Sequence, residues 1–209
     1  MKISAILLAA GQSKRMGTNK LLLDIGGQAL VERVVKVLLR SKVDSVIVVV
    51  GFEWKRVRQR LWTKGVRVVY NRQYREGMAA SIREGLRHID QGSHGVLIVL
   101  ADHPFITSDT IDQLIDAYRG SQKGIVCPTY QGKRGHPVIF NLERYGKALS
   151  QLKGDIGGRA VIEAHRDDLL EFAIDSPGVI RDIDVWEDYD EFRTLLAEES
   201  DRNNEKSKG

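Results

Sequence analysis

Residues 3–20 read ISAILLAAGQSKRMGTNK, and this stretch decides the fold class. Residues 3–9 form a short apolar run, which is typical of a buried β-strand. The residues that follow are mostly small or basic, which is typical of a loop. In open α/β sheets, ligands bind beyond the carboxyl ends of the strands. The stretch therefore predicts a buried strand that leads directly into a binding loop.

The same alternation continues along the first half of the chain. Short apolar runs at 45–50, 66–70, 96–100 and 125–126 predict further strands. Strands that are apolar on both faces and separated by helices predict a mostly parallel sheet in a three-layer α/β/α fold. Between these strands, apolar residues recur at helical spacing in three segments and predict three amphipathic helices. Thr107 is the predicted N-cap of the third helix. The apolar faces consist of Leu30, Val31, Val34, Val35 and Leu38 in the first helix, of Trp54, Val57, Leu61 and Trp62 in the second, and of Ile111, Leu114, Ile115 and Tyr118 in the third.

The second half of the chain completes this sheet with a mixed edge. Residues 137–140 and 169–174 predict strands, and residues 142–152 predict a helix. A chain of 209 residues fits one domain at roughly 150 residues per domain. We expect this single domain to span 1–197, and we expect 198–209, which lack any apolar residue, to form a disordered tail.

Composition excludes several classes of protein. The 32 Lys and Arg residues against 28 Asp and Glu give a net charge of +4, a bias compatible with an anionic small substrate. The single cysteine, Cys127, excludes an intramolecular disulfide and a four-cysteine zinc site. No apolar run approaches the ~20 residues of a membrane span, and no signal peptide is visible. The basic helix around 54–62 lacks aromatic residues in base-stacking positions. We expect a soluble, cytoplasmic protein that binds neither membrane nor nucleic acid.

The loop after the first strand has the composition of a polyphosphate site. Small residues around Gly11 let backbone N–H groups approach a polyanion, while Lys14, Arg15 and Lys20 supply compensating charge. The glycine spacing matches neither the Walker A loop nor the GxGxxG dinucleotide fingerprint. An ordinary surface turn with scattered basic residues remains the alternative.

Acidic residues at two places predict a metal site. Asp102 ends a buried strand just before Pro104, where a carboxylate is well placed to hold a cation against bound phosphates. A turn or N-cap role for Asp102 is the alternative. Asp182 and Asp184 stand two residues apart in a predicted extended segment, so both side chains point to one face. Spacing alone does not choose between these two.

Several motifs together resemble the nucleotidyltransferase family that includes the molybdenum cofactor cytidylyl- and guanylyltransferases. Together they span residues 3–196 in family order, which makes the combination specific although each motif alone is weak. Besides the loop at 8–20, the motifs are Asn71 with 76–81 (EGMAAS), 100–104 (LADHP), 135–138 (GHPV), 154–157 (GDIG) and 182–184 (DID).

This resemblance implies a Rossmann-like nucleotidyltransferase fold and a reaction. The enzyme would transfer CMP from CTP to the terminal phosphate of molybdopterin and release pyrophosphate, with Mg²⁺, or Mn²⁺ in its place, as cofactor. A molybdoenzyme would be a further partner that receives the product. Ala10 and the sequence from Lys20 to Leu23 resemble the cytidylyl branch, since the guanylyl branch usually has a second glycine at the position of Ala10. The methyl group of Ala10 would narrow the pocket against a purine.

The resemblance also implies roles for individual residues, carried over motif by motif. Asp182 is expected in a structural hydrogen bond. The implied catalytic residues are Lys20, Arg15 and Asp102; the nucleotide-binding residues are Leu8, Ala9, Ala10, Gly11, Arg15, Lys20, Asn71, Gly77 and Ser81; the acceptor-binding residues are His136, Gly154 and Asp155; and the metal ligands are Asp102 and Asp184.

Alternatives remain open at this point. A GTP-using molybdenum cofactor guanylyltransferase is one alternative. A cytidylyl- or uridylyltransferase of a sugar or polyol phosphate is another, since such enzymes have a similar loop and aspartate. A nucleotide-binding assembly factor for a molybdoenzyme, with little turnover, is a different class. Asn71, Ser81 and His136 are each equally compatible with a structural role.

Overall fold

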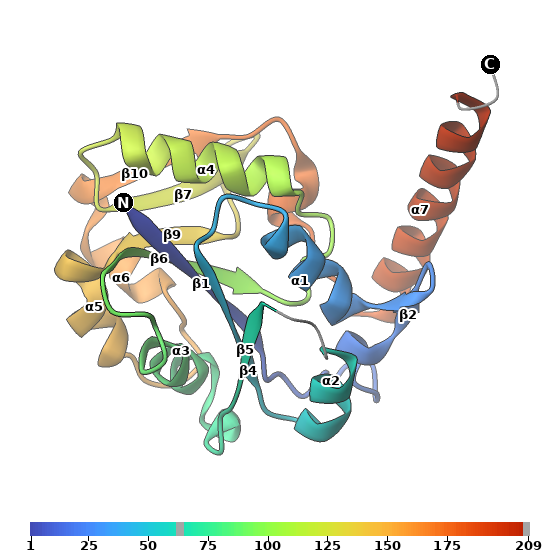
Figure 1. The fold of residues 1–209 in the computed structure, drawn as a ribbon, viewed down its shortest axis with the longest axis horizontal. Coiled ribbons are helices and arrows are strands. Elements are labelled where there is room, and N and C mark those ends of the chain that lie inside the picture. Colours follow the sequence, from blue (N-terminus) through green and yellow to red (C-terminus); the bar gives the residue numbers. More distant parts are fainter. Residues whose placement is uncertain (62–64, 207–209) are drawn as a thin grey trace.

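The computed structural model describes residues 1–61 and 65–206, and its centre is a mixed eight-stranded sheet (Figure 1). The strands follow the order β10-β7-β9-β6-β1-β4-β5, and the short β8 pairs with β7. A separate two-stranded sheet joins β2 and β3. The strands are β1 (Lys2–Ala9), β2 (Asp24–Ile25), β3 (Gln28–Ala29), β4 (Ser45–Val50), β5 (Val66–Tyr70), β6 (Ser93–Leu100), β7 (Ile125–Tyr130), β8 (Lys133–Arg134), β9 (Val138–Asn141) and β10 (Leu169–Ala173).

Most pairs in the main sheet are parallel, as the sequence predicts. β1 lies between β6 and β4 and is parallel to both, β4 is parallel to β5, and β7 is parallel to β10. β9 runs antiparallel to both β6 and β7 and supplies the mixed character. Because β1, β4, β5 and β6 are mutually parallel, their carboxyl ends meet at one edge of the sheet.

Helices cover both faces of the sheet, which confirms the three-layer α/β/α prediction. The helices form two groups, one on each face of the sheet, and each group packs in its own apolar cluster. Leu7 of β1 belongs to the cluster of the first group, and Ile6, on the opposite face of β1, belongs to the cluster of the second group. The first group is α1 (Leu30–Leu39), α2 (Trp54–Arg60), α4 (Ser108–Gly120) and the start of α7 (Trp186–Lys206); the second is α3 (Met78–Leu86), α5 (Leu142–Ser150) and α6 (Arg159–Ala164).

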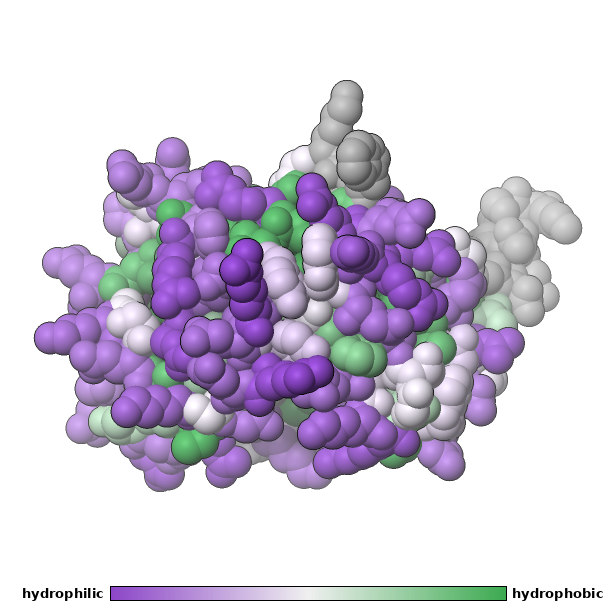
Figure 2. Space-filling model, turned by 90° about the horizontal axis from the view of Figure 1, so that it is seen from below, coloured by the Kyte–Doolittle hydropathy of each residue, from purple (hydrophilic) through white to green (hydrophobic). Residues whose placement is uncertain are grey.

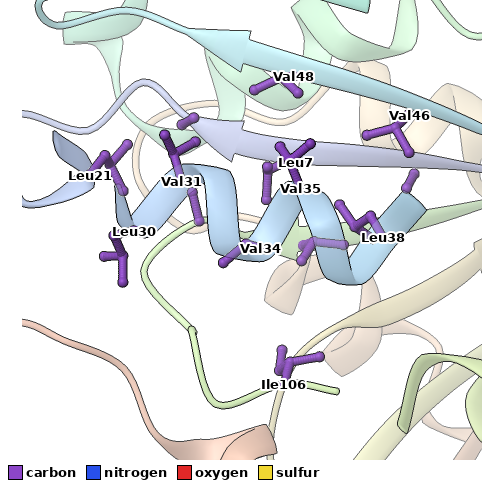
Figure 3. Packing of buried hydrophobic residues seen from close by; sticks show 14 of the residues in the cluster. Leu7, Leu21, Leu30, Val31, Val34, Val35, Leu38, Val46, Val48 and Ile106 are labelled. Carbon is purple, nitrogen blue, oxygen red and sulfur yellow. The ribbon is translucent and has the colours of Figure 1, made fainter. Parts of the chain in front are cut away.

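Helix α1 forms where its apolar residues recur at helical spacing. Its buried stripe faces β1 and β4, and Figure 3 shows Val35 of α1 beside Leu7 of β1. Glu32 fixes the start of the helix, because its Oε2 accepts a 2.6 Å hydrogen bond from the Ala29 backbone N–H. Thr107 caps α4 as predicted: its hydroxyl accepts a hydrogen bond from the Thr110 N–H.

Several boundaries differ from the sequence expectation. α2 ends at Arg60, and Trp62, which the sequence assigns to its apolar face, lies outside the described residues. β7 continues from the predicted 125–126 to Tyr130 because it pairs with both β10 and β8. The predicted tail boundary at residue 198 falls inside α7, which continues to Lys206 and extends away from the body in Figure 1. Its packed start nucleates the helix, and the Glu, Arg and Lys residues beyond propagate it well.

Figure 2 shows a face on which hydrophilic residues predominate and hydrophobic residues form small groups. Among the described residues, no helix combines the length and apolar composition needed to cross a membrane.

Two neighbouring leucines in α1 test this packing. Leu38 is fully buried, whereas Leu39 is 41% exposed. We expect Leu38→Ala to lower the free energy of unfolding by about 2–5 kcal/mol, because it removes transfer energy and leaves a cavity. Leu39→Ala, with the same change in helix propensity, should cost under about 1 kcal/mol. Denaturant unfolding of both variants measures the difference, and equal losses would contradict the assignment of Leu38 to the core.

Candidate functional site

A cavity of about 460 Å³ lies at the carboxyl ends of the parallel strands. The loop after β1, the segment after β6 and the start of α3 form its walls, together with the segment before α7. This is the position where open α/β sheets bind ligands. Ten of the residues singled out in the sequence line it: Leu8, Ala10, Gly11, Arg15, Lys20, Gly77, Ser81, Asp102, Asp155 and Asp184.

Lys20 is held at the centre of this cavity by the loop that carries it. Ser13 Oγ accepts a 3.1 Å hydrogen bond from the Lys20 backbone N–H. The buried Asn19 side chain accepts a hydrogen bond from the Leu21 N–H and donates one to the Phe52 carbonyl. The loop is therefore closed on itself and tied to the end of β4, which fixes where the lysine side chain begins.

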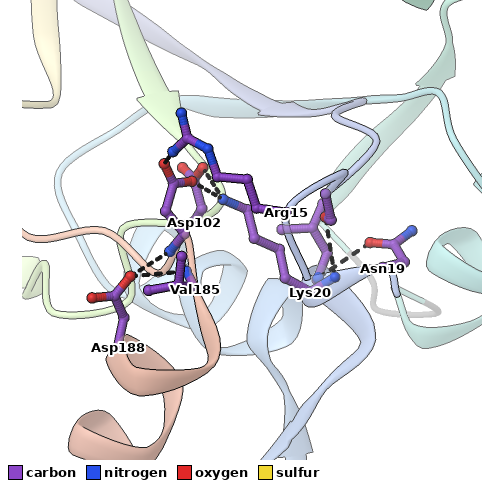
Figure 4. Close-up of polar contacts among 9 residues, drawn as sticks. Arg15, Asn19, Lys20, Asp102, Val185 and Asp188 are labelled. Carbon is purple, nitrogen blue, oxygen red and sulfur yellow. Dashed lines mark hydrogen bonds and ion pairs between the residues drawn. The ribbon is translucent and has the colours of Figure 1, made fainter. Parts of the chain in front are cut away.

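The Lys20 ammonium bridges two aspartates that are 82 residues apart in sequence. Its Nζ lies 2.7 Å from Asp102 Oδ2 and 2.8 Å from Asp184 Oδ1, as Figure 4 shows for the cluster. Burial alone would lower the pKa of Lys20, but the two carboxylates outweigh it and raise the pKa above its usual value. The hydrogen bond from Lys20 likewise lowers the pKa of Asp184. Both groups are therefore charged at neutral pH.

Asp184 is positioned from two sides. The carboxylate of Asp188 accepts hydrogen bonds from the N–H groups of Asp184 and Val185, at 2.8 and 2.9 Å, at the start of α7 (Figure 4). The Ile183 N–H donates to the Asp102 carbonyl at 2.9 Å, which ties the segment to the end of β6. The guanidinium of Arg15 pairs with the second oxygen of Asp184, and its side chain is 72% exposed. The Arg15 guanidinium therefore pairs with Asp184 at the surface, whereas the backbone around Asp184 is held by hydrogen bonds at two points.

Asp102, Asp182 and Asp184 form a group that fits a divalent cation. Each offers a carboxylate oxygen, and the three oxygens lie within 4.8 Å of one another. Carboxylates are the hard oxygen ligands that Mg²⁺, Mn²⁺ and Ca²⁺ prefer. The structural hydrogen bond expected for Asp182 is absent from the part of the chain that is described. Burial and the neighbouring carboxylates instead raise the pKa of Asp182.

Asn71 supports the cavity from behind and does not line it. Its backbone N–H bonds to Val50, its Oδ1 accepts a hydrogen bond from the Gln73 N–H, and its Nδ2 donates to Ser81 Oγ at 3.1 Å. Ser81, which does line the cavity, is therefore oriented by Asn71. Ala9 is buried in the apolar cluster under α1, so its side chain also lies outside the cavity.

The GDIG motif at 154–157, for which the resemblance implies acceptor binding, forms hydrogen bonds with the start of α3. Asp155 Oδ1 accepts a 2.9 Å hydrogen bond from the Met78 N–H, and the Gly154 carbonyl accepts one from the Ala79 N–H at 3.1 Å. These bonds satisfy two free N–H groups of the helix N-terminus. Gly77 has φ +99° and a Cβ there would lie 2.6 Å from the Gly154 carbonyl oxygen, so this close approach requires glycine.

His136 lines a second cavity of about 400 Å³ rather than the first. Met78 lines both cavities, so they adjoin. Burial lowers the pKa of His136 to about 4, and the imidazole is therefore neutral. Burial also raises the pKa of Cys127, on the wall of this cavity, to about 11, which keeps the thiol protonated. The wall is largely apolar, with Ile98, Val138, Phe140 and Ile162 beside charged Arg134, Arg159 and Glu163.

Sequence reasoning missed three residues of this site. Tyr74 and Arg75 line the first cavity, and Asp188 orients Asp184. Tyr74 and Arg75 follow the carboxyl end of β5, so the rule that ligands lie at strand ends was the available signal. Asp188 had a weaker signal, because an acidic residue in the first turn of a helix is also common without any ligand nearby.

Comparison with known proteins identifies relatives along most of the chain. Residues 5–169 match a family model described as the MobA-like NTP transferase domain. Purine catabolism protein PucB of Bacillus subtilis (strain 168) is 29% identical over 207 aligned residues, which cover 92% of this chain and 96% of PucB. Nicotine blue oxidoreductase of Paenarthrobacter nicotinovorans is 28% identical, over 88% of this chain and 93% of the relative.

Solved structures agree with these matches. The crystal structure of Rv0371c from Mycobacterium tuberculosis H37Rv superimposes with a TM-score of 0.82 at 29% identity, covering 93% of this chain and 98% of that one. A second structure of Rv0371c, in complex with manganese, has a TM-score of 0.76 at 26% identity. The predicted Rossmann-like nucleotidyltransferase fold is thus confirmed, and a similar protein binds a divalent cation.

The ion pairs at Asp184 make a prediction about metal binding without nucleotide. Arg15 and a divalent cation would compete for the same carboxylate, so Arg15→Ala should bind Mn²⁺ about fivefold more tightly, the equivalent of about 1 kcal/mol for an exposed pair. Lys14→Ala is the matched control, since Lys14 lines the cavity but makes no ion pair in residues 1–61 and 65–206. Titration calorimetry with Mn²⁺ alone measures both. Weaker binding to Arg15→Ala would mean that Arg15 organises the carboxylates.

Proposed function

The chain belongs to the family of MobA-like NTP transferase domains, and from that premise we propose that it transfers CMP from CTP to the terminal phosphate of molybdopterin, with release of pyrophosphate. One observation carries the proposal. Lys20 bridges Asp102 and Asp184 in a cavity that the small residues of the loop after β1 also line. Cations for a polyphosphate and carboxylates for a metal are thus held within a few ångströms of each other.

The nucleotide side of the reaction needs charge more than it needs acid–base groups. The acceptor phosphate is already an anion, so it attacks the α-phosphorus of the NTP without a general base, while the bond to pyrophosphate breaks. Lys20 and Arg15 would stabilise the charge that develops on the departing pyrophosphate, and the loop amides from Ala10 to Ser13 would hold the polyphosphate. Positioning and electrostatics then account for the rate.

The carboxylates would hold the cofactor. Asp102 and Asp184 are the proposed ligands, and Asp182 is close enough to join them. A divalent cation bound there, Mg²⁺ or Mn²⁺ in its place, would supply charge neutralisation for the phosphates. Lys20 and Arg15 would then exchange their carboxylate partners for phosphate oxygens.

The adjoining cavity is the proposed acceptor site. Its apolar wall, including Phe140 and Ile162, suits the ring system of a molybdopterin better than it suits a sugar or polyol. His136, neutral and half-buried, is available there as a hydrogen-bond partner. Met78 stands between the two cavities, next to the N-terminus of α3, where the acceptor phosphate would meet the nucleotide.

Pyrophosphate release tests the reaction. The purified chain is mixed with Mg²⁺, each of the four NTPs and either molybdopterin, a sugar phosphate or a polyol phosphate. We expect release with CTP and molybdopterin, and its loss in Asp102→Asn. Release with GTP would assign the chain to the guanylyl branch. Release with a sugar or polyol phosphate would show that this compound, and not molybdopterin, is the acceptor. Binding of CTP and molybdopterin without any release would favour the assembly-factor alternative.

Base preference has an independent readout that needs no acceptor. Because the Ala10 methyl group lines the cavity, we expect Mg²⁺-CTP to raise the melting temperature more than equimolar Mg²⁺-GTP does. Thermal unfolding at several ligand concentrations gives the two affinities. A larger shift with Mg²⁺-GTP would overturn the cytidylyl assignment while leaving nucleotidyl transfer intact.

Lys20 should matter for turnover far more than a surface lysine. Lys20→Ala is expected to lower kcat/KM for CTP by roughly 10²-fold or more, because it removes a preorganised charge at the site of bond breaking. Lys36→Ala, which removes an exposed charge from α1, is the control and should change little. Steady-state pyrophosphate release measures both variants, and a Lys20→Ala enzyme with near-normal kcat/KM would refute the role.

A further inference from the structure

An antiparallel strand pair brings two histidines together beside the second cavity. β9 runs antiparallel to β6, with Val138 opposite Ile98, so the start of β9 lies next to the end of β6. His103 follows β6, directly after Asp102, and His136 precedes β9. One of the two histidines therefore belongs to the segment that carries a proposed metal ligand, and the other to the wall of the second cavity.

The two imidazole rings pack edge to face. Their centroids are 5.3 Å apart and their planes form an angle of 66°, an arrangement that aromatic rings prefer. Both Nδ1 atoms are buried, and neither has a hydrogen-bond partner in residues 1–61 and 65–206. The contact therefore depends on the shape of the two rings and not on a hydrogen bond from either Nδ1 atom.

His103 is a fixed support for the other ring. The residue is only 6% exposed and lines neither cavity. Its backbone N–H donates a 3.3 Å hydrogen bond to the Leu100 carbonyl, and the carbonyl of the preceding Asp102 accepts one from the Ile183 N–H at 2.9 Å. A closely packed ring on a backbone that is tied at two points has little room to move.

His136 depends on packing for the direction of its ring. Its backbone N–H donates a 2.7 Å hydrogen bond to the Val179 carbonyl, which fixes where the side chain begins. Beyond that point, no described hydrogen bond holds the Nδ1 atom of the imidazole. The aromatic ring against which this imidazole packs is that of His103.

We propose that His103 is a positioning residue of the acceptor site, which holds the His136 imidazole in the orientation that binds a polar group of the acceptor. The inference rests on the proposed function, because it requires an acceptor in the second cavity. His103 acts only through His136. The residue next to a proposed metal ligand thus supports a wall of the acceptor site, which joins the two cavities mechanically.

Equilibrium binding of molybdopterin tests the inference. It is measured with Mg²⁺ and a CTP analogue that has a methylene group between the α- and β-phosphorus atoms, so that no transfer occurs. His103→Ala should weaken molybdopterin binding by about tenfold, because a misplaced His136 loses its hydrogen bond to the acceptor. His103→Phe should retain most of the affinity, since the ring and not its nitrogen atoms makes the contact.

Two further measurements separate positioning from a general loss of structure. Affinity for Mn²⁺ alone should stay within about twofold of the wild-type value in both His103 variants, because Asp102 keeps its place. In a chain that already carries His136→Ala, His103→Ala should cause no further loss of molybdopterin affinity, since both act through one imidazole.

A matched control and a second variant complete the design. His165→Ala removes the ring that lies 4.9 Å from the Tyr145 ring, outside both cavities, and should leave molybdopterin affinity unchanged. If His103→Ala fails to fold, His103→Met fills the same space with a flexible side chain. This variant should keep the fold but not the fixed wall, so it should weaken molybdopterin binding in the same way.

The outcomes separate the inference from the function on which it rests. A wild-type chain that binds no molybdopterin would overturn the proposed function and the inference with it. Full affinity in His103→Ala or His103→Met would overturn the inference alone, as would additive losses from His103→Ala and His136→Ala. Coupled losses in a chain that binds molybdopterin but releases no pyrophosphate from CTP would overturn nucleotidyl transfer and support the inference.

Discussion

The two ion pairs of Lys20, with Asp102 and Asp184, hold the candidate site together. A single ammonium group joins the loop after β1, the end of β6 and the segment before α7. Such a cluster balances its charges only as long as its members stay paired. A divalent cation bound by the aspartates would displace the positively charged side chains from their carboxylate partners. A bound triphosphate would give these side chains new negatively charged partners. The charges of the site are therefore balanced again only when both ligands are bound. Metal and nucleotide are therefore expected to bind cooperatively.

Local sequence patterns predicted the part of the fold that depends on burial. β4 and β5 match the predicted ranges to the residue. β4 is buried along almost its whole length, as expected of a strand in a covered parallel sheet, whereas β5 lies at the edge of the sheet with Arg67 and Tyr70 exposed. Lys20 and Asp102 were also within reach, since strand ends meet at one edge, whereas Asp184 was chosen over Asp182 only through the family resemblance. The role of Asp188 was not within reach, because it depends on a contact with the Asp184 backbone that no spacing along the chain encodes.

Asn71 shows why the type of a residue predicts less than its surroundings do. An amide after a buried strand could form hydrogen bonds with the edge of a base. The described hydrogen bonds of Asn71 are instead made with other residues of the chain. It acts on the cavity only through Ser81.

Shared architecture does not separate this chain from relatives with different activities. A protein named for purine catabolism and one named as an oxidoreductase both align along most of the chain, so alignment over the whole sheet does not by itself assign a substrate. What distinguishes one member from another must then lie in the walls of the two cavities rather than in the sheet. Ala10 and Tyr74 border the first cavity, and the apolar wall around Phe140 borders the second. We therefore expect substrate choice to depend on a few side chains in these walls, apart from the Lys20 cluster that we propose to bind the phosphates.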